Sequence, residues 1–174
     1  INAGNNVVVN TGTASGKSLI YQSSAIMNLD QNPDCRIAVF YPLKALVSDQ
    51  LKSWKEVMTK AGLPSNIVAK IDGDIPPDER EEALKTARVV LFTPDVLHAW
   101  LMRNVSLEVC RDFLANLNLI VIDEVHALES VFGSNFALLF RRLHAARNTC
   151  AKENSNLTQI QIVATGATIA NPKD

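Results

Sequence analysis

Six short apolar runs, rich in valine, isoleucine and leucine, recur along the chain and are separated by longer, more polar stretches. Several of these runs are almost continuously apolar, which is typical of β-strands that are covered on both faces. We therefore predict strands at residues 7–9, 35–41, 66–71, 88–93, 117–122 and 159–164.

The stretches between these runs carry apolar residues at helical spacing. One stripe, at every third or fourth position, extends over residues 43–61 and should end at Gly62, and another extends over residues 132–146. Two further helices are expected, one after Lys17 and one that opens at Pro94. Strands that alternate with helices indicate an α/β fold with a parallel sheet and right-handed crossovers.

The same patterns place three further features. Trp54 and Trp100 fall on helical stripes, so we expect both in the core. The charged run at residues 78–82 is expected to be a solvated first turn of a helix.

Composition narrows the class of protein. The chain has 174 residues, of which 47% are hydrophobic and 20% charged, as in a single globular domain. No apolar run approaches the roughly 18 residues of a membrane span, so we expect no membrane partner. Lysine and arginine (17) nearly balance aspartate and glutamate (18), so any binding of nucleic acid must depend on local patches. The three cysteines form no C-x-x-C pair, which favours reduced, buried thiols in a cytoplasmic or nuclear protein.

A glycine-containing loop follows the first apolar run and opens a predicted helix. Small residues there let backbone N–H groups approach nucleotide phosphates, and the helix N-terminus adds partial positive charge. Lys17 would supply a full charge, and Ser18 would supply a hydroxyl ligand to magnesium. Thr11 stands where the strict pattern has glycine. The predicted nucleotide-binding residues are Thr11, Gly12, Thr13, Ala14, Ser15, Gly16, Lys17 and Ser18.

Two carboxylates, Asp123 and Glu124, end the fifth apolar run, and His126 follows two residues later. Carboxylates at the carboxyl end of a parallel strand face the crevice in which ligands bind. We assign Asp123 to magnesium and Glu124 to orienting and deprotonating the water that attacks ATP. The predicted catalytic residues are Lys17, Asp123, Glu124 and His126, and the signal of His126 is the weakest because a lone histidine is often only a polar residue.

Together, these two segments resemble motifs I and II of the superfamily 2 DExH-box helicases, in which the first position of motif I need not be glycine. Other segments follow in the family's order: Tyr41 to Leu46 is similar to motif Ia, Thr93-Pro94-Asp95 to motif Ib and Gly166-Ala167-Thr168 to motif III. The details most resemble the branch of RecQ-like DNA-repair helicases that carries a C-terminal cysteine cluster. The resemblance implies a three-layer RecA-like P-loop NTPase fold with a central, mainly parallel sheet.

The family also implies ATP and Mg²⁺ as cofactors and a nucleic-acid strand as partner, and it favours DNA over RNA. Lys44 would neutralise a phosphate, while neighbouring residues would offer backbone N–H groups and a helix N-terminus in sequence-blind, salt-sensitive contacts. The residues implied along this track are Pro42, Lys44, Gly73, Thr93, Pro94 and Asp95.

Motif III would couple the nucleotide site to strand separation through Gly166, Ala167 and Thr168. The usual Ser-Ala-Thr reads Gly-Ala-Thr here, so the first hydroxyl is absent, although Thr165 stands one residue earlier. This departure puts the route of coupling in doubt and leaves the ATP site intact.

Motors of this superfamily contain two RecA-like lobes. We expect residues 1–174 to be one ATP-binding lobe of a larger protein, with the second lobe outside this sequence. The isolated lobe should hydrolyse little ATP, because an arginine finger from the other lobe is worth about 10³–10⁵ in rate. Two alternatives stay open, namely a double-strand translocase or other P-loop ATPase that does not unwind, and a non-catalytic nucleotide-sensing module.

Overall fold

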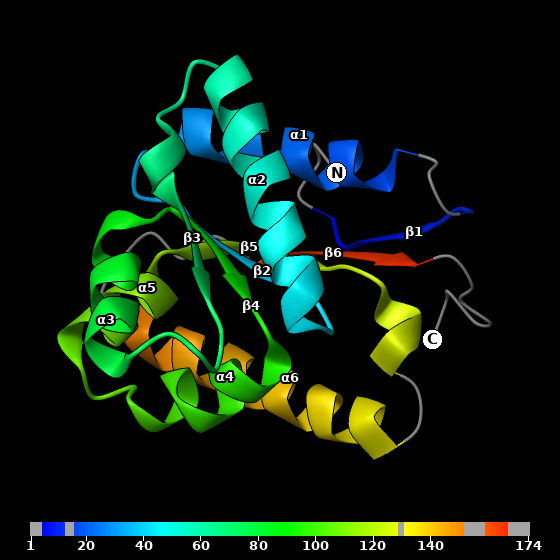
Figure 1. Cartoon of the computed structure of the whole chain (residues 1–174). Helices are drawn as coiled ribbons and strands as arrows, with labels where there is room; N and C mark the ends of the chain where they lie inside the picture. The colour runs from blue at the N-terminus through cyan, green and yellow to red at the C-terminus, as the bar shows by residue number, and fades with distance from the viewer. Residues whose placement is uncertain (1–4, 13–15, 129–130, 152–158, 167–174) are drawn as a thin grey trace.

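The computed structural model describes residues 5–12, 16–128, 131–151 and 159–166. In this part of the chain all six predicted strands form, and they pair in one parallel sheet with the order β1-β6-β5-β2-β4-β3 (Figure 1). The observed strand ends lie within two residues of the predicted ones. The strands are β1 Val7–Asn10, β2 Arg36–Phe40, β3 Val68–Ile71, β4 Val89–Phe92, β5 Leu117–Ile122 and β6 Gln161–Gly166.

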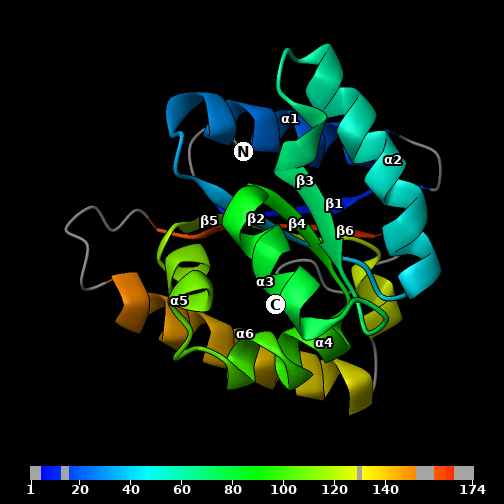
Figure 2. The ribbon, with the colours of Figure 1, turned by 60° about the vertical axis from the view of Figure 1, so that its left-hand side comes forward.

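Helices cover both faces of the sheet and make three layers (Figures 1 and 2). The first face carries α1 Lys17–Gln31 and α2 Lys44–Lys60, and the second carries α3 Pro77–Thr86, α4 Pro94–Ala99, α5 Glu108–Ala115 and α6 Val131–Ala151. Short 3₁₀ turns complete the described elements: η1 Ser65–Ile67, η2 Leu101–Arg103 and η3 Val125–Leu128. The four predicted helices are confirmed, whereas α5 was not predicted and α3 was expected only as a solvated first turn at residues 78–82.

Successive side chains of a strand point to opposite faces of the sheet, and the sheet therefore has two separate apolar cores, one on each face. In β2, Val39 points to the core under α1 and α2, while Phe40 points to the core under α3 to α6. Phe40 stacks on Phe92 with ring centroids 5.7 Å apart. Because both faces are buried, every position of such a strand must be apolar, which explains the continuous apolar runs of the sequence.

The sites predicted from the sequence gather at one edge of the sheet because all its strands are parallel. The loop before Lys17 leaves β1, Asp123 leaves β5, and Gly166 ends β6. The segments implied in nucleic-acid contact leave the other three strands, with Pro42 after β2 and Thr93 after β4. The strand order therefore separates the predicted nucleotide side, at β1-β6-β5, from a second side at β2-β4-β3.

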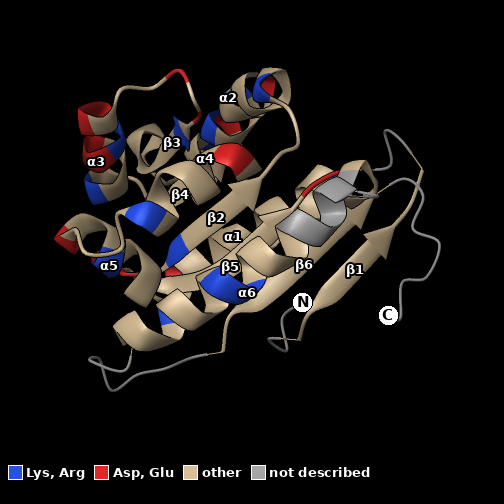
Figure 3. Ribbon diagram, turned by 90° about the horizontal axis from the view of Figure 1, so that it is seen from below, with Lys and Arg blue, Asp and Glu red and all other residues tan. Residues whose placement is uncertain are grey.

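Charged residues are mixed over the outer elements. Figure 3 shows basic and acidic segments on several of the outer helices, and their totals nearly balance. None of the described helices is both long and apolar enough to cross a membrane. The side chains of Cys35, Cys110 and Cys150 are buried, as the sequence predicts.

Two glycines, at opposite ends of helices, adopt the left-handed backbone conformation. Gly16 is the residue before α1 and Gly62 follows α2, each with φ of 78°. At Gly62 the chain ends α2 in a Schellman motif, in which the N–H groups of Gly62 and Leu63 donate to the carbonyls of Thr59 and Met58 at 3.0 and 2.9 Å. A side chain at either glycine would therefore strain the backbone, although no described atom lies within 4 Å of a Cβ placed there.

We expect Gly16→Ala and Gly62→Ala each to lower the free energy of unfolding by about 1–2 kcal/mol, because alanine disfavours the left-handed conformation. Gly12→Ala is the matched control, since Gly12 has open space around it and no positive φ. Chemical denaturation of the three variants measures these changes. Equal stability of Gly16→Ala and Gly12→Ala would contradict the conformation assigned to Gly16.

Candidate functional site

The phosphate loop ends at the N-terminus of α1. Gly16 turns the chain into the helix, and its carbonyl accepts the Leu19 N–H at 3.0 Å. Lys17 is only 7% exposed, and its Nζ donates to the Thr11 carbonyl at 3.2 Å, so the ammonium group is held against the loop. Thr13, Ala14 and Ser15 lie outside the described residues. A buried lysine at a helix N-terminus is a suitable setting for an anion.

Asp123 is anchored by three donors from three parts of the chain. Its Oδ1 accepts the hydroxyl of Thr165 and, at 3.0 Å, the backbone N–H of Glu124. Its Oδ2 accepts the hydroxyl of Tyr21 at 3.1 Å. Asp123 is 8% exposed and Thr165 is fully buried. The carboxylate is therefore fixed in direction at the carboxyl end of β5, and one side of it remains at the surface.

Thr165, which sequence reasoning left out of the coupling set, contacts the Asp123 carboxylate. It lies on β6 opposite Val9 of β1, and its hydroxyl reaches the Asp123 carboxylate on the neighbouring strand. The hydroxyl that motif III lacks at Gly166 is thus present one position earlier in the chain. The sequence did contain this signal, because a threonine directly precedes the glycine. Gly166 ends β6 and its carbonyl accepts the Thr11 N–H at 3.3 Å, whereas Ala167 and Thr168 lie outside the described residues.

Glu124 has an unusual backbone for a residue that is not glycine. Its φ is 53°, and its carbonyl accepts the Ala127 N–H at 2.8 Å, so the chain turns sharply out of the strand into η3. Strained backbone of this kind recurs at functional sites. Oε2 of Glu124 lies 3.2 Å from Nδ1 of His126, close enough for an ion pair with a protonated imidazole, although the two atoms are not aligned for a hydrogen bond. The Glu124 carboxylate thus has an oxygen without a hydrogen-bond donor among the described residues.

Behind Asp123, a buried chain of hydroxyl groups extends into the core. The Tyr21 and Tyr41 hydroxyl oxygens are 3.3 Å apart, and the indole N–H of Trp54 donates to the Tyr41 hydroxyl at 3.0 Å. The rings of Tyr21 and Trp54 stack with centroids 5.8 Å apart. Burial, with the nearby Tyr41 and Asp123, raises the pKa of Tyr21 far above its ordinary value, so its hydroxyl stays a donor. Sequence reasoning placed Trp54 in the core and did not foresee this polar chain.

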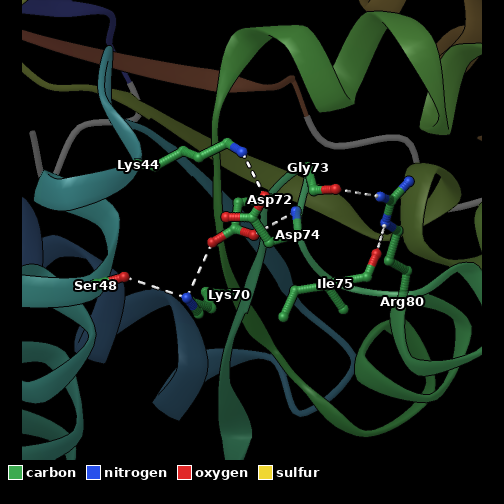
Figure 4. A network of polar contacts seen from close by, with 8 residues as sticks. All are labelled: Lys44, Ser48, Lys70, Asp72, Gly73, Asp74, Ile75 and Arg80. Carbon is green, nitrogen blue, oxygen red and sulfur yellow. Dashed lines mark hydrogen bonds and ion pairs between the residues drawn. The ribbon is translucent and has the colours of Figure 1, made fainter.

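On the second side of the edge, Lys44 begins α2 and faces the loop that follows β3 (Figure 4). Its Nζ lies 2.7 Å from Oδ1 of Asp74, and both side chains are more than half exposed. The hydrogen bond to Asp74 is the main cause of a raised pKa at Lys44. Gly73 is adjacent to the same ammonium group, because a Cβ there would lie 3.2 Å from Nζ. The structure therefore brings two predicted track residues, Lys44 and Gly73, together.

The loop that carries Gly73 and Asp74 is fixed from both ends. Asp72 is 1% exposed; its Oδ2 pairs with Lys70 at 3.0 Å and its Oδ1 accepts the Asp74 N–H at 3.0 Å. Burial by itself raises the pKa of Asp72, but these hydrogen bonds and the charges of Lys70 and Lys44 lower it below its usual value. Arg80 holds the other end by donating to the carbonyls of Ile75 and Gly73 at 2.7 and 3.3 Å (Figure 4).

The remaining track residues lie at the starts of α2 and α4. Pro42 is half-buried between β2 and α2, whereas Thr93 is 4% exposed at the end of β4. Pro94 opens α4 as predicted, and Asp95 is exposed in the first turn. Pro94 and Asp95 also border a cavity of about 700 Å³ between α4 and α6. Phe136 and Leu139 of α6 line the same cavity. Thr93 presents no side-chain cap to the helix, so only its backbone is suited to contact a ligand.

Known helicases resemble this chain over nearly its whole length. The DEAD/DEAH box helicase family model matches residues 1–174. The ATP-dependent helicase HRQ1 of Saccharomyces cerevisiae is 39% identical over 173 residues, which are 99% of this chain and 16% of that protein. The uncharacterized ATP-dependent helicase YprA of Bacillus subtilis is 33% identical over 174 residues, which are 100% of this chain and 22% of that protein.

A solved structure shares the fold over nearly the whole chain. The DUF1998 helicase MrfA bound to DNA and AMPPNP superposes with a TM-score of 0.88 at 31% identity, covering 99% of this chain and 23% of that one. The present chain thus spans about a fifth of the length of these relatives. Similarity to HRQ1 is consistent with the RecQ-like branch, while the C-terminal cysteine cluster of that branch stays a prediction. The family match over the whole chain, the helicase relatives and the shared RecA-like fold together show that the chain belongs to the DEAD/DEAH box helicases of superfamily 2.

Proposed function

We propose that this chain is the first motor lobe of an ATP-dependent DNA helicase and that it binds Mg-ATP at β1-β6-β5 and one DNA strand at β2-β4-β3. The observation that carries the proposal is the edge of the sheet, where the phosphate loop, the anchored Asp123 and the Lys44–Asp74 pair all follow strands of the same parallel sheet. A second RecA-like lobe in the parent protein would close over this edge. The share of the relatives' length that the chain spans is in keeping with such a larger protein.

On the nucleotide side, each residue has a chemical task that its surroundings suit. Lys17 and the N-terminal N–H groups of α1 would neutralise the β- and γ-phosphates. Glu124 would orient a water molecule and accept its proton as the water attacks the γ-phosphate, for which a carboxylate oxygen that receives no hydrogen bond from the described residues is well suited. Its turn out of β5 separates it from Asp123, so the two acids can act on different atoms.

The residues present fit a magnesium ion that is shared with the nucleotide. Among the described residues no group of three or more histidine, cysteine or acidic side chains forms a metal site. Mg²⁺ commonly uses one or two protein ligands, several waters and the phosphates themselves. Asp123, whose direction three donors fix, and Ser18 would hold the ion, and bound Mg²⁺ would neutralise charge on the phosphates.

On the nucleic-acid side, the exposed Lys44 ammonium and the backbone around Gly73 and Thr93 suit contact with phosphates rather than bases. A motor that accepts any sequence needs such contacts. The preference for DNA is supported by MrfA, a relative of known structure with bound DNA. Lys44 forms an ion pair with Asp74, so a phosphate would have to displace the Asp74 carboxylate from the ammonium group.

Two substitutions separate nucleotide binding from hydrolysis. We expect Lys17→Ala to weaken Mg-ATP binding by at least about tenfold, the loss of one charge-assisted contact. Glu124→Gln should keep that binding and lower turnover in the two-lobe protein by about 10²–10⁴, the usual contribution of a general base. Calorimetry and steady-state hydrolysis measure the two effects.

The matched control for these two variants is Lys52→Ala, which removes an exposed lysine of α2. It should alter neither quantity. Normal turnover by Glu124→Gln would show that another group accepts the proton. Unchanged ATP affinity in Lys17→Ala would show that Lys17 does not hold the phosphates, and no ATP binding at all by the unsubstituted protein would favour a non-catalytic module.

The Lys44–Asp74 pair gives a test of the nucleic-acid side. We expect Lys44→Ala to reduce the slope of log affinity against log salt by about one for single-stranded DNA, as loss of one phosphate contact requires. Asp74→Asn should instead strengthen binding by about two- to fivefold. In this variant, Lys44 does not have to break an ion pair to contact a phosphate, and one negative charge that repels the phosphate is removed. Fluorescence anisotropy over a series of salt concentrations measures both.

Asp34→Asn makes the same change of charge in the exposed loop before β2, at the opposite edge of the sheet, and should leave the affinity unchanged. Weaker binding by Asp74→Asn would mean that Asp74 orients Lys44 for the phosphate and does not compete with it.

A further inference from the structure

The buried hydroxyl chain behind Asp123 has a defined direction. The indole N–H of Trp54 can only donate, and the ionised carboxylate of Asp123 can only accept. Since the single hydroxyl proton of Tyr21 is given to Asp123, the bond between the two tyrosines must be donated by Tyr41. Every proton in the chain therefore points from Trp54 through Tyr41 and Tyr21 to Asp123, over donor–acceptor distances of 3.0, 3.3 and 3.1 Å.

The two ends of this chain lie in the two halves of the molecule. Asp123 ends β5 on the nucleotide side, next to the phosphate loop. Tyr41 directly precedes Pro42, and Trp54 lies on α2, the helix that Lys44 begins. The connection between the halves thus consists of side chains from β5, α1, the end of β2, and α2. Ser18, at the start of α1, also interacts with the Tyr21 hydroxyl.

Packing alone does not account for these polar groups. Tyr21, Tyr41 and Trp54 are at most 1% exposed, and an apolar core of the same shape needs no hydroxyl there. Buried polar groups destabilise a fold unless each finds a partner, and a chain of such bonds strengthens cooperatively. A small displacement of α2 against the sheet would lengthen one bond and so alter the donors that Asp123 receives.

We propose that Tyr21 and Tyr41 are positioning residues that transmit the binding of a nucleic-acid strand at the start of α2 to the Asp123 carboxylate in the nucleotide site. This inference rests on the proposed function of the two sides. Phosphate contact at Pro42 and Lys44 shifts the position of α2 and Tyr41. The shift alters the hydrogen bonds between the hydroxyl groups and, through them, the hydrogen bond that Asp123 accepts. It acts beside the motif III route, in which Thr165 reaches the other oxygen of the same carboxylate.

The experiment uses the two-lobe protein and compares its ATP hydrolysis with and without single-stranded DNA. Tyr41→Phe and Tyr21→Phe remove one hydroxyl each and preserve the ring. We expect the ratio of stimulated to unstimulated rate to fall by about fivefold or more in each variant, within the usual range of coupling between sites. In the double variant, the loss should be close to that of either single variant. The first substitution already interrupts the series of hydrogen bonds, so the second has no further effect on it.

Thr59→Ala is the matched control, since it also removes a hydroxyl from α2, but one that is exposed and bonded only to the Lys55 carbonyl at 2.9 Å. Its ratio should equal that of the unsubstituted protein. A merely structural role for the tyrosines would lower both rates and the melting temperature together and leave the ratio unchanged. DNA affinity, measured in parallel, shows whether the strand still binds.

An unchanged ratio in Tyr41→Phe and Tyr21→Phe, or fully additive losses in the double variant, would overturn this inference while the proposed function stands. An unsubstituted two-lobe protein that binds no single-stranded DNA or no Mg-ATP would instead overturn the proposed function itself. The two failures are therefore distinguished by the unsubstituted protein alone.

Discussion

Because the six strands of the sheet pair in parallel, each of them ends at the same edge, and the segments that leave them must meet there. Residues as distant in sequence as Lys17, Lys44 and Asp123 thereby belong to one surface. An antiparallel arrangement would send alternate segments to opposite edges and divide both sites. The helices on the two faces cover the central strands, whose side chains point alternately into the two cores.

Asp123 is the group on which the nucleotide side is built. A carboxylate that is only 8% exposed would be costly without partners, and here it accepts hydrogen bonds from a tyrosine, a threonine and a backbone N–H. These donors come from α1, β6 and its own loop, so the site cannot change geometry without moving three elements. The side of the edge that carries Lys44 differs, because the Lys44–Asp74 ion pair is exposed. Hydrogen bonds of Asp72 and Arg80 hold the loop that contains Asp74.

Sequence patterns anticipated much of the fold, for reasons that the structure makes clear. Strands buried on both faces leave continuous apolar runs, and the long helices leave stripes, so Trp54 and Trp100 were correctly placed in the core. Helix α5 was not predicted, although its buried residues Cys110, Phe113 and Leu114 stand at helical spacing. Helix α3 buries only Leu84 among its ten residues. Its sequence therefore has no apolar stripe and indicates only a solvated segment.

The residue types of the sites and their order along the chain were determined by the sequence alone, since phosphate, magnesium and a proton acceptor each require particular side chains. The α/β class followed from the periodicities. Only the tertiary structure decided the partners, because Tyr21 with Asp123, Thr165 with Asp123 and Asp74 with Lys44 meet across separate strands and helices. A local pattern records the face on which a side chain lies, whereas a hydrogen bond between distant segments depends on the strand order and register that pack them together.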